Sequence, residues 1–276
     1  MATPRVKGGH LPSVPPLLTP IDPPAGHPGA NTNVGVAFDG TELYVTGGNN
    51  TIPVFSPAGV ETREITATRR YGTLAYDGTR DQLWSCYVNT PRTIERIDKT
   101  TGAVQQTIDV SVVGTHFTFC DGLAYDGGSA ADSSDDRLYY SPYISSTIFR
   151  RDTAGNLIDS FPFSAINTDI STCGNSGLAV GGPDIWLADN CCEHIYRASK
   201  PPTAQLDLFN SAGGTRPEDM ECDDVTFAPA FAIWVRTFEN NTLRACEAPN
   251  PCGRGGLPPP PPPHEGPEFG QPAPSY

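Results

Sequence analysis

The amino-acid sequence predicts an all-β protein built from repeated small sheets, and three observations lead to this prediction. The chain of 276 residues contains 28 Gly and 29 Pro, which favours short strands joined by turns over long helices. Asp-Gly pairs stand between apolar runs, as they do in hairpin turns. One pattern of apolar runs and turns recurs about every 38 to 55 residues, which is typical of a repeat protein.

The repeated pattern occurs in five segments. In each, a short apolar strand ends in Asp-Gly or a similar turn, a strand rich in Tyr, Trp, Leu and Val follows, and two further strands flank a second turn. The segments begin at Gly35, Gly72, Gly122, Gly177 and Asp224. One such sheet cannot bury both of its faces, but radial packing of several sheets covers them. We therefore expect a β-propeller, with five four-stranded blades and Pro-rich extended arms at both ends.

The expected domain organisation follows from where the repeats stop. Residues 1–30 form a Pro-rich N-terminal arm, residues 31–248 the propeller, and residues 249–276 a Pro-rich tail. The fifth segment shows no obvious fourth strand, and an edge strand donated by the N-terminal arm, such as Val14 to Ile21, could complete it. The six prolines Pro258 to Pro263 predict an extended polyproline II segment, which would serve as a spacer or as a docking arm.

The charge of the chain excludes two classes of partner. The net charge is −13 and the pI about 4.7. Nucleic-acid binding and attraction to anionic membranes both need a basic face, so neither is expected. The sequence also contains no apolar run of the roughly 20 residues that a membrane helix needs.

Two stretches resemble a known superfamily. They are "GLAYDG…LYYS…TIFRRDTAG" in the third segment and "SGLAVGGPDIWLADN…HIYR" in the fourth. These stretches resemble the NHL-repeat and SMP-30/gluconolactonase-like propellers, and the resemblance covers most of the expected domain. It implies the propeller fold and leaves the activity open.

The resemblance also implies where the eight cysteines lie. In such propellers, the loop between the second and third strands shares a rim with the loop that enters the next blade. That relation implies disulfides, and "CEAPNPC" adds a pair that is close in sequence. The expected pairs are Cys86–Cys120, Cys173–Cys191, Cys192–Cys222 and Cys246–Cys252, with Cys191 and Cys192 interchangeable. Such bonds indicate an oxidising compartment, although the N-terminus lacks the apolar stretch of a secretory signal.

A zinc site is the alternative for part of this set. Cys191, Cys192 and His194 are suitable ligands, with Cys173 or Cys222 as a fourth. Adjacent cysteines differ from the usual C-x2-4-C spacing, which favours disulfides over zinc. Redox catalysis needs C-x-x-C or a similarly activated thiolate, which the sequence lacks.

The SMP-30-like enzymes hold a divalent cation at the centre of one propeller face, and the resemblance implies a matching Ca²⁺ site. Carboxylate and amide oxygens at the blade entries would supply the ligands. The matching residues are Asn33, Asp121, Asn175 or its neighbour Ser176, and Asp223. In the alternative, these side chains form turns by accepting local backbone N–H groups. Apart from Ca²⁺, no cofactor is expected.

The stretch "RPEDMECDD" contains five acids within seven residues. It is expected to be a solvated acidic loop, or else a patch that binds a cation or a basic partner. Together with the ends of the proline run, it gives the candidate partner-binding residues Glu218, Asp219, Glu221, Pro258 and Pro263.

These observations favour a non-catalytic propeller over an enzyme. The motifs G-x-S-x-G, H-E-x-x-H, the Walker loop and the strand-linked G-x-G-x-x-G are all missing. We predict a protein that displays rim loops and docks protein partners, or neighbouring copies in a homo-oligomer, through its Pro-rich arms. A surface or fibre component of a virion (phage) or an extracellular assembly would fit, located outside the cell or on the virion surface. The alternative is a secreted metal-dependent lactonase or hydrolase of the SMP-30 type.

Overall fold

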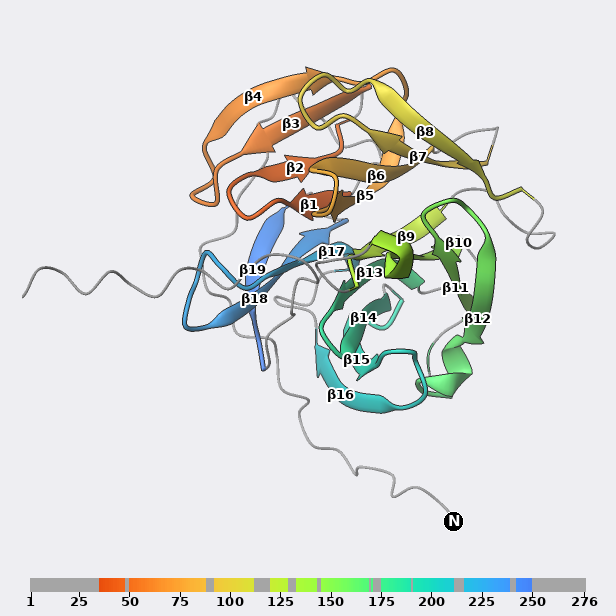
Figure 1. Ribbon diagram of the computed structural model, residues 1–276. Helices are drawn as coiled ribbons and strands as arrows, with labels where there is room; N and C mark the ends of the chain where they lie inside the picture. The colour runs from red at the N-terminus through yellow and green to blue at the C-terminus, as the bar shows by residue number, and fades with distance from the viewer. Residues whose placement is uncertain are drawn as a thin grey trace, which may run out of the picture.

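The computed structural model describes a five-bladed β-propeller (Figure 1). The described residues are 35–47, 50–87, 92–111, 120–128, 133–142, 145–168, 170, 175–189, 191–210, 216–238 and 242–249. They form five antiparallel sheets around a central axis, which confirms the predicted fold class and the number of blades. The arms lie outside the described residues, so the predicted domain boundaries stay predictions.

The strands follow the chain order within each blade. Blade 1 consists of β1 (Val36–Phe38), β2 (Leu43–Val45), β3 (Thr51–Phe55) and β4 (Glu61–Thr66). Blade 2 consists of β5 (Tyr71–Asp77), β6 (Gln82–Tyr87), β7 (Thr93–Ile97) and β8 (Val104–Asp109). Blade 3 consists of β9 (Cys120–Asp126), β10 (Arg137–Pro142), β11 (Thr147–Asp152) and β12 (Leu157–Pro162).

Blade 4 consists of β13 (Asn175–Gly181), β14 (Asp184–Asp189), β15 (His194–Ser199) and β16 (Gln205–Asn210). Blade 5 consists of β17 (Pro217–Asp223), β18 (Phe231–Thr237) and β19 (Leu243–Ala248). Two single-turn 3-10 helices, η1 (Ser133–Asp135) and η2 (Phe163–Ala165), lie in blade 3 and after it. Among the described residues, no helix is long and apolar enough to cross a lipid bilayer.

The first strand of every blade lies nearest the axis (Figure 1). These inner strands contact one another in sequence around the ring, and β17 contacts β1 to close it. Five hydrophobic clusters fill the spaces between neighbouring blades. Trp84, Trp186 and Trp234 of the second strands are fully buried in three of them, which stabilises the packing by roughly 3 kcal/mol for each side chain.

The fifth blade differs from its prediction. Its first strand is β17, whereas the sequence pattern predicted a strand that begins at Asp224. The error arose because β17, with the sequence PEDMECD, carries four acids and lacks the apolar run of the other inner strands. The blade contains three strands among the described residues, and the edge strand expected from Val14 to Ile21 lies outside them.

The disulfide predictions are confirmed in one case and wrong in two. Cys86 at the end of β6 is bonded to Cys120 at the start of β9, with their Cα atoms 5.7 Å apart. Cys191 and Cys222 each form a disulfide bond as well, but not with Cys192 or Cys246. Among the described residues, Cys192 and Cys246 are free thiols, which corrects the expected pairs Cys192–Cys222 and Cys246–Cys252. Cys173 and Cys252 lie outside the described residues.

The shifted strand explains the first of these errors. Cys222 was expected to precede the first strand of blade 5, on the rim that carries Cys191 and Cys192. It instead lies near the other end of β17, one residue before Asp223, and is buried between blades 4 and 5. Cys192 is exposed, and Asp189 accepts hydrogen bonds from the backbone N–H groups of Cys191 and Cys192. The "CCEH" stretch thus forms a turn around the Asp189 carboxylate.

Candidate functional site

The propeller has two ends, which carry different kinds of polar groups. We call the end where the first and second strands of each blade are joined the turn end. We call the opposite end, where the inner strands begin, the bulge end. The carboxyl groups of Asp39, Asp77 and Asp223 at the turn end each have several hydrogen-bond donors. The buried carboxyl group of Asp121 at the bulge end has none among the described residues.

A repeated carboxylate brace stabilises the turn end. One oxygen of Asp77 accepts the backbone N–H groups two and three residues later, and the other accepts the indole N–H of Trp84 at 3.0 Å. Asp223 does the same with its own turn and with Trp234 at 2.9 Å. Asp39 repeats the arrangement with the hydroxyl of Tyr44. The brace therefore ties the turn to the second strand in three blades.

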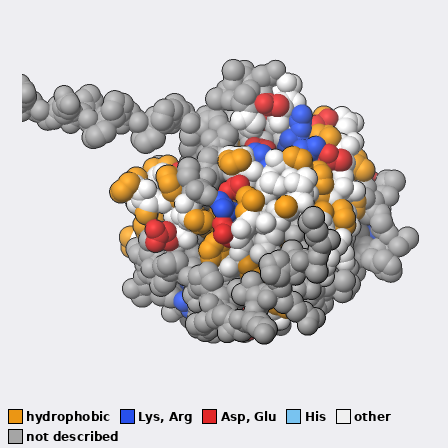
Figure 2. Space-filling model, turned by 90° about the horizontal axis from the view of Figure 1, so that it is seen from below, with side chains coloured by type: hydrophobic (Ala, Val, Ile, Leu, Met, Phe, Trp, Pro, Cys, Tyr) orange, Lys and Arg blue, Asp and Glu red, His pale blue; other side chains and the backbone are white. Residues whose placement is uncertain are grey.

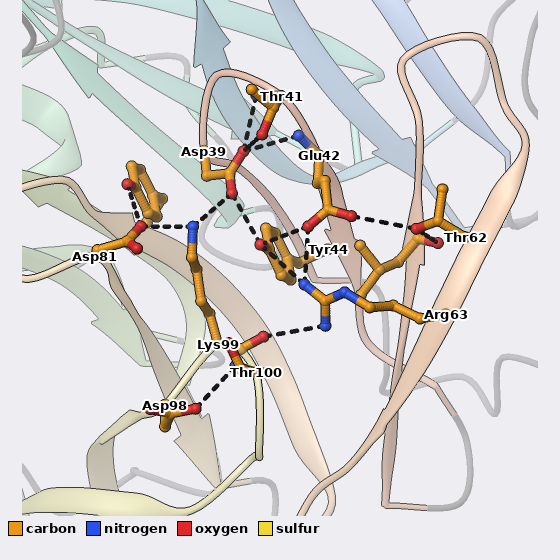
Figure 3. Close-up of polar contacts among 12 residues, drawn as sticks. Asp39, Thr41, Glu42, Tyr44, Thr62, Arg63, Asp81, Asp98, Lys99 and Thr100 are labelled. Carbon is orange, nitrogen blue, oxygen red and sulfur yellow. Dashed lines mark hydrogen bonds and ion pairs between the residues drawn. The ribbon is translucent and has the colours of Figure 1, made fainter.

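A polar network at the turn end joins blades 1 and 2 (Figure 3). Lys99 contacts Asp39 at 2.8 Å and Asp81 at 2.5 Å, and Arg63 contacts Glu42 at 2.8 Å. Burial alone would raise the pKa of Asp39, but Lys99 and the N–H groups of its turn outweigh burial and hold that pKa well below its usual range. A carboxylate with so many partners is suited to stabilising the fold.

At the bulge end, four inner strands each contain a β-bulge at the same level. The pairing with the second strand shifts between Tyr71 and Leu74 in β5, and between Cys120 and Gly122 in β9. It shifts again between Asn175 and Leu178 in β13, and between Pro217 and Asp219 in β17. Counted back from the last residue of each strand, the bulges contain equivalent residues. These four residues, which we call the bulge ring, are Gly72, Asp121, Ser176 and Glu218.

Two members of the bulge ring interact across the axis. Asp121 belongs to blade 3 and Glu218 to blade 5, with blade 4 between them, and their strands β9 and β17 still contact each other. Burial raises the pKa of the Asp121 carboxyl well above its usual value, and the charge of Glu218 raises it further, although Arg216 opposes this. Arg216 also contacts Glu218 at 3.3 Å. The carboxyl groups of Asp121 and Glu218 thus point to a common region.

Below the ring, two further acids of β17 reach across the axis. Asp219 accepts the backbone N–H groups of Val36 at 3.0 Å and Leu74 at 3.2 Å, from blades 1 and 2. Glu221 accepts the N–H of Tyr76 at 3.2 Å. Because blades 5 and 2 are not neighbours, these side chains lie across the axis and close it below the bulge ring.

Buried Arg236 lies beside Asp219 on the neighbouring strand, where the two residues are paired. Burial lowers the pKa of Arg236 to about 9, although Asp219 opposes the shift, so the guanidinium remains charged at neutral pH. Burial also raises the pKa of Asp219, against three backbone N–H groups. The Asp219 carboxyl group and the Arg236 guanidinium thus place polar groups on an axis that apolar side chains could have filled.

Three buried oxygen atoms at this end have no hydrogen-bond partner. They are Oγ1 of Thr73, Oγ of Ser176 and Oδ1 of Asp219, on β5, β13 and β17. Leaving such an atom unsatisfied costs roughly 1–3 kcal/mol, and native structures contain few of them. Other buried atoms without such a partner are distributed over the described residues, but these three oxygens lie beside the bulge ring, where a ligand or ordered water could complete them.

Two residues of the expected Ca²⁺ site lie at opposite ends of the propeller. Asp121 lies at the bulge end, whereas Asp223 is part of the brace at the turn end, where its own blade supplies its hydrogen-bond donors. Asn33 and the side chain of Asn175 lie outside the described residues. Within those residues, no three His, Cys, Asp or Glu side chains form a group that could hold a metal ion. Asp223 forms a turn with local N–H groups, which was the stated alternative.

The expected acidic loop is in fact the inner strand β17. Glu218 and Asp219 are buried and Glu221 is half-buried, so they do not form the exposed patch that was predicted to bind a partner. Pro258 and Pro263 lie outside the described residues. Asp121 and Glu218 were predicted for other roles, Ser176 only as an alternative to Asn175 in the Ca²⁺ site, and Arg236 for none. The only sequence signal was a polar residue one or two places before an apolar strand.

Comparison with known proteins supports the fold and goes no further. The structure resembles the crystal structure of Myxococcus xanthus glutaminyl cyclase with a TM-score of 0.58 and 11% identity, over 80% of this chain and 94% of that one. A catalytically inactive virginiamycin B lyase from Staphylococcus aureus with quinupristin has a TM-score of 0.47 and 17% identity, over 80% of this chain and 68% of that one. A streptogramin B lyase has a TM-score of 0.46 and 13% identity, over 86% of this chain and 74% of that one. No protein-family model matches the chain, and no curated protein sequence matches it significantly.

The chain is therefore a β-propeller by its fold. The resemblance predicted from the repeat motifs is confirmed at this level. An identity of 11% shows a shared fold and does not transfer an activity.

Proposed function

We propose that this propeller binds a small polar ligand at the bulge end of its axis, in contact with the bulge ring. The observation that carries the proposal is the alignment of four β-bulges at one level, three of which place Asp121, Ser176 and Glu218 around the axis. Bulges next to functional sites redirect side chains away from the regular ladder. Because Asp219 and Glu221 lie across the axis below the bulge ring, a ligand would approach from the bulge end.

The energetics of the site support binding over a purely structural role. A fold gains nothing from a buried carboxyl group without a donor, and no described hydrogen bond reaches the Asp121 side chain. Groups whose pKa values are strongly shifted by burial and by a neighbouring charge concentrate at functional sites. The buried polar groups of the bulge end thus lower the stability of the fold, which is typical of a functional site.

The proposal is tested by screening small polar molecules for stabilisation of the full-length protein. A ligand present at 100 times its Kd raises the free energy of unfolding by about 2.7 kcal/mol, which thermal denaturation detects. We expect the Ser176→Ala variant to bind such ligands at least tenfold more weakly. Ser160→Ala removes the same hydroxyl from the exposed face of β12 and should bind like the wild type. Ligands that bind both variants equally would contradict the site.

The second candidate function is the docking role predicted from the sequence. Its support lies in the Pro-rich arms and in exposed apolar residues on outer strands, where Leu157, Ile158 and Leu206 are each more than 40% exposed. On the face shown in Figure 2, hydrophobic side chains are interspersed with charged and polar ones. This face thus offers scattered apolar contacts. The disulfide bonds fit an oxidising location, on a virion surface or outside the cell.

Analytical ultracentrifugation separates this candidate from the first. If the arms join copies of the chain, the full chain will self-associate, and a chain ending at residue 249 will be monomeric. Equal sedimentation of the two would remove the docking role of the tail between copies.

A further inference from the structure

The chemistry of the bulge end indicates which kind of ligand it takes, and this step rests on the proposed function. Among the described residues, side chains that accept hydrogen bonds outnumber those that only donate them at this end. Two ring carboxyl groups, Asp121 and Glu218, lie above a third, Asp219, which has a free oxygen. Ser176 and Thr73 add hydroxyl oxygens without partners. A ligand that completes these groups must donate hydrogen bonds.

Charge leads to the same conclusion. Four acids surround the axis at this end: Asp121, Glu218, Asp219 and Glu221. The opposing cations are Arg236, which is buried beside Asp219, and Arg216, which contacts Glu218 from the edge. Arg216 is 38% exposed, and its guanidinium lies 4.2 Å from the ring centroid of Phe238. Asp121 is the acid whose described contacts include no cation within ion-pair distance.

We propose that the ligand carries a primary ammonium group, which binds between Asp121 and Glu218 with the Ser176 hydroxyl as a third acceptor. An ammonium group has three donors and no acceptor, which matches three oxygen atoms from three inner strands. It would also replace the proton that the neighbouring Glu218 favours on Asp121, because an opposite charge at close range stabilises the carboxylate. Binding is therefore accompanied by release of a proton from the carboxyl pair.

Anionic and neutral ligands fit this place less well. A carboxylate or phosphate would add a negative charge beside two buried carboxyl groups, and like charges held close together repel strongly. A neutral amide offers two donors and leaves one acceptor without a partner. The order of affinity should thus be ammonium, then amide, then carboxylate.

The test uses three probes of similar size, propylammonium, propionamide and propionate, with the full-length protein at neutral pH. Ligand-detected NMR titrations should give propylammonium at least a tenfold lower Kd than propionamide, and no saturable binding of propionate. Calorimetry in two buffers of different ionisation enthalpy should show proton release only with propylammonium.

Two variants assign the effect to the ring. Asp121→Asn should weaken propylammonium binding at least tenfold and abolish the proton release. Asp109→Asn removes the same charge from the exposed end of β8 and should leave both unchanged. Tightest binding of propionamide or propionate would overturn the ammonium inference while leaving a polar-ligand site. Failure of all three probes to bind would overturn the proposed function itself, and equal binding by Asp121→Asn would remove the role of the ring.

Discussion

Buried carboxyl groups at the two ends of this propeller differ in the hydrogen-bond donors that surround them, as Asp77, Asp223 and Asp121 show. At the turn end, Asp77 and Asp223 each accept two turn N–H groups and an indole N–H. At the bulge end, Asp121 is also buried, yet the neighbouring charge with the largest effect on its pKa is that of another acid, Glu218. The first arrangement stabilises the fold, because hydrogen bonds within the protein replace those that the carboxylate loses to water. The second costs stability and leaves the carboxyl group available.

The difference shows which groups the fold itself requires. The brace repeats in blades 1, 2 and 5 with the same local geometry, as expected of a structural device. The residues of the bulge ring, in contrast, differ from blade to blade: Gly, Asp, Ser and Glu. Equivalent backbone positions with unlike side chains indicate an asymmetric site on a symmetric frame.

The largest effect is expected from breaking the brace. Asp77→Ala leaves the Trp84 indole N–H without its acceptor and removes one of the two acids that contact Arg80, and it should lower the free energy of unfolding by about 3–5 kcal/mol. Urea unfolding measures the loss. Asp159→Ala removes an acid from a partly exposed ion pair with Arg150 and should cost less than about 1 kcal/mol. Similar losses in the two variants would show that the brace has no special role.

The second effect comes from the disulfide at the bulge end. Replacing Cys86 and Cys120 together by Ser should lower the free energy of unfolding by about 2–4 kcal/mol. Because Cys120 directly precedes Asp121, the double variant should also bind the proposed ligand more weakly. Cys192→Ser changes an exposed free thiol and should alter stability by less than about 0.5 kcal/mol. A fully stable double variant would contradict this expectation.

A third variant should raise stability at the bulge end. Asp121→Asn replaces a buried carboxyl group, whose ionisation is opposed by burial and by Glu218, with a neutral amide, and it should raise the free energy of unfolding by about 1–2 kcal/mol at neutral pH. In the wild type, the folded-state pKa of Asp121 lies above the unfolded value, so the native state binds more protons between the two values. Stability therefore falls as the pH rises through that interval.

The pH dependence separates this effect from a general gain in packing. Chemical unfolding between pH 4 and 8 should give a flatter stability profile for Asp121→Asn than for the wild type. Asp109→Asn should keep the wild-type slope. A less stable Asp121→Asn protein would mean that the carboxyl group stabilises the fold, and the contrast between the ends would be lost.

The smallest effect is a gain at the turn end of blade 4. This blade has Gly181 where three blades have the brace aspartate, and the indole nitrogen of its buried Trp186 has no hydrogen-bond partner. Gly181→Asp should supply one and raise the free energy of unfolding by about 0.5–1.5 kcal/mol. Gly181→Ala provides the control for the lost glycine. Equal changes in both variants would mean that no brace has formed.

Sequence reasoning identified the repeated elements well because hairpin turns and alternating strands are local signals. The segments beginning at Gly35, Gly72, Gly122 and Gly177 correspond to blades 1 to 4. It failed at β17, where Asp219 and Glu221 occupy positions that are glycine, threonine or alanine in the other inner strands. Acids in a buried strand are not expected from propensity, and their partners Val36, Leu74 and Tyr76 lie about 145 to 183 residues away.

The sequence by itself determined the all-β class and the five blades, because both depend on patterns that recur within a blade or between successive blades. The Cys86–Cys120 bond followed from the chain's resemblance to known propellers. Only the tertiary structure decided which acids meet. Glu218 reaches Asp121 past an intervening blade, and Asp223 is separated from both by the length of an inner strand. Closing the ring brings strands from both ends of the propeller to one axis, and no local pattern encodes which side chains will face each other there.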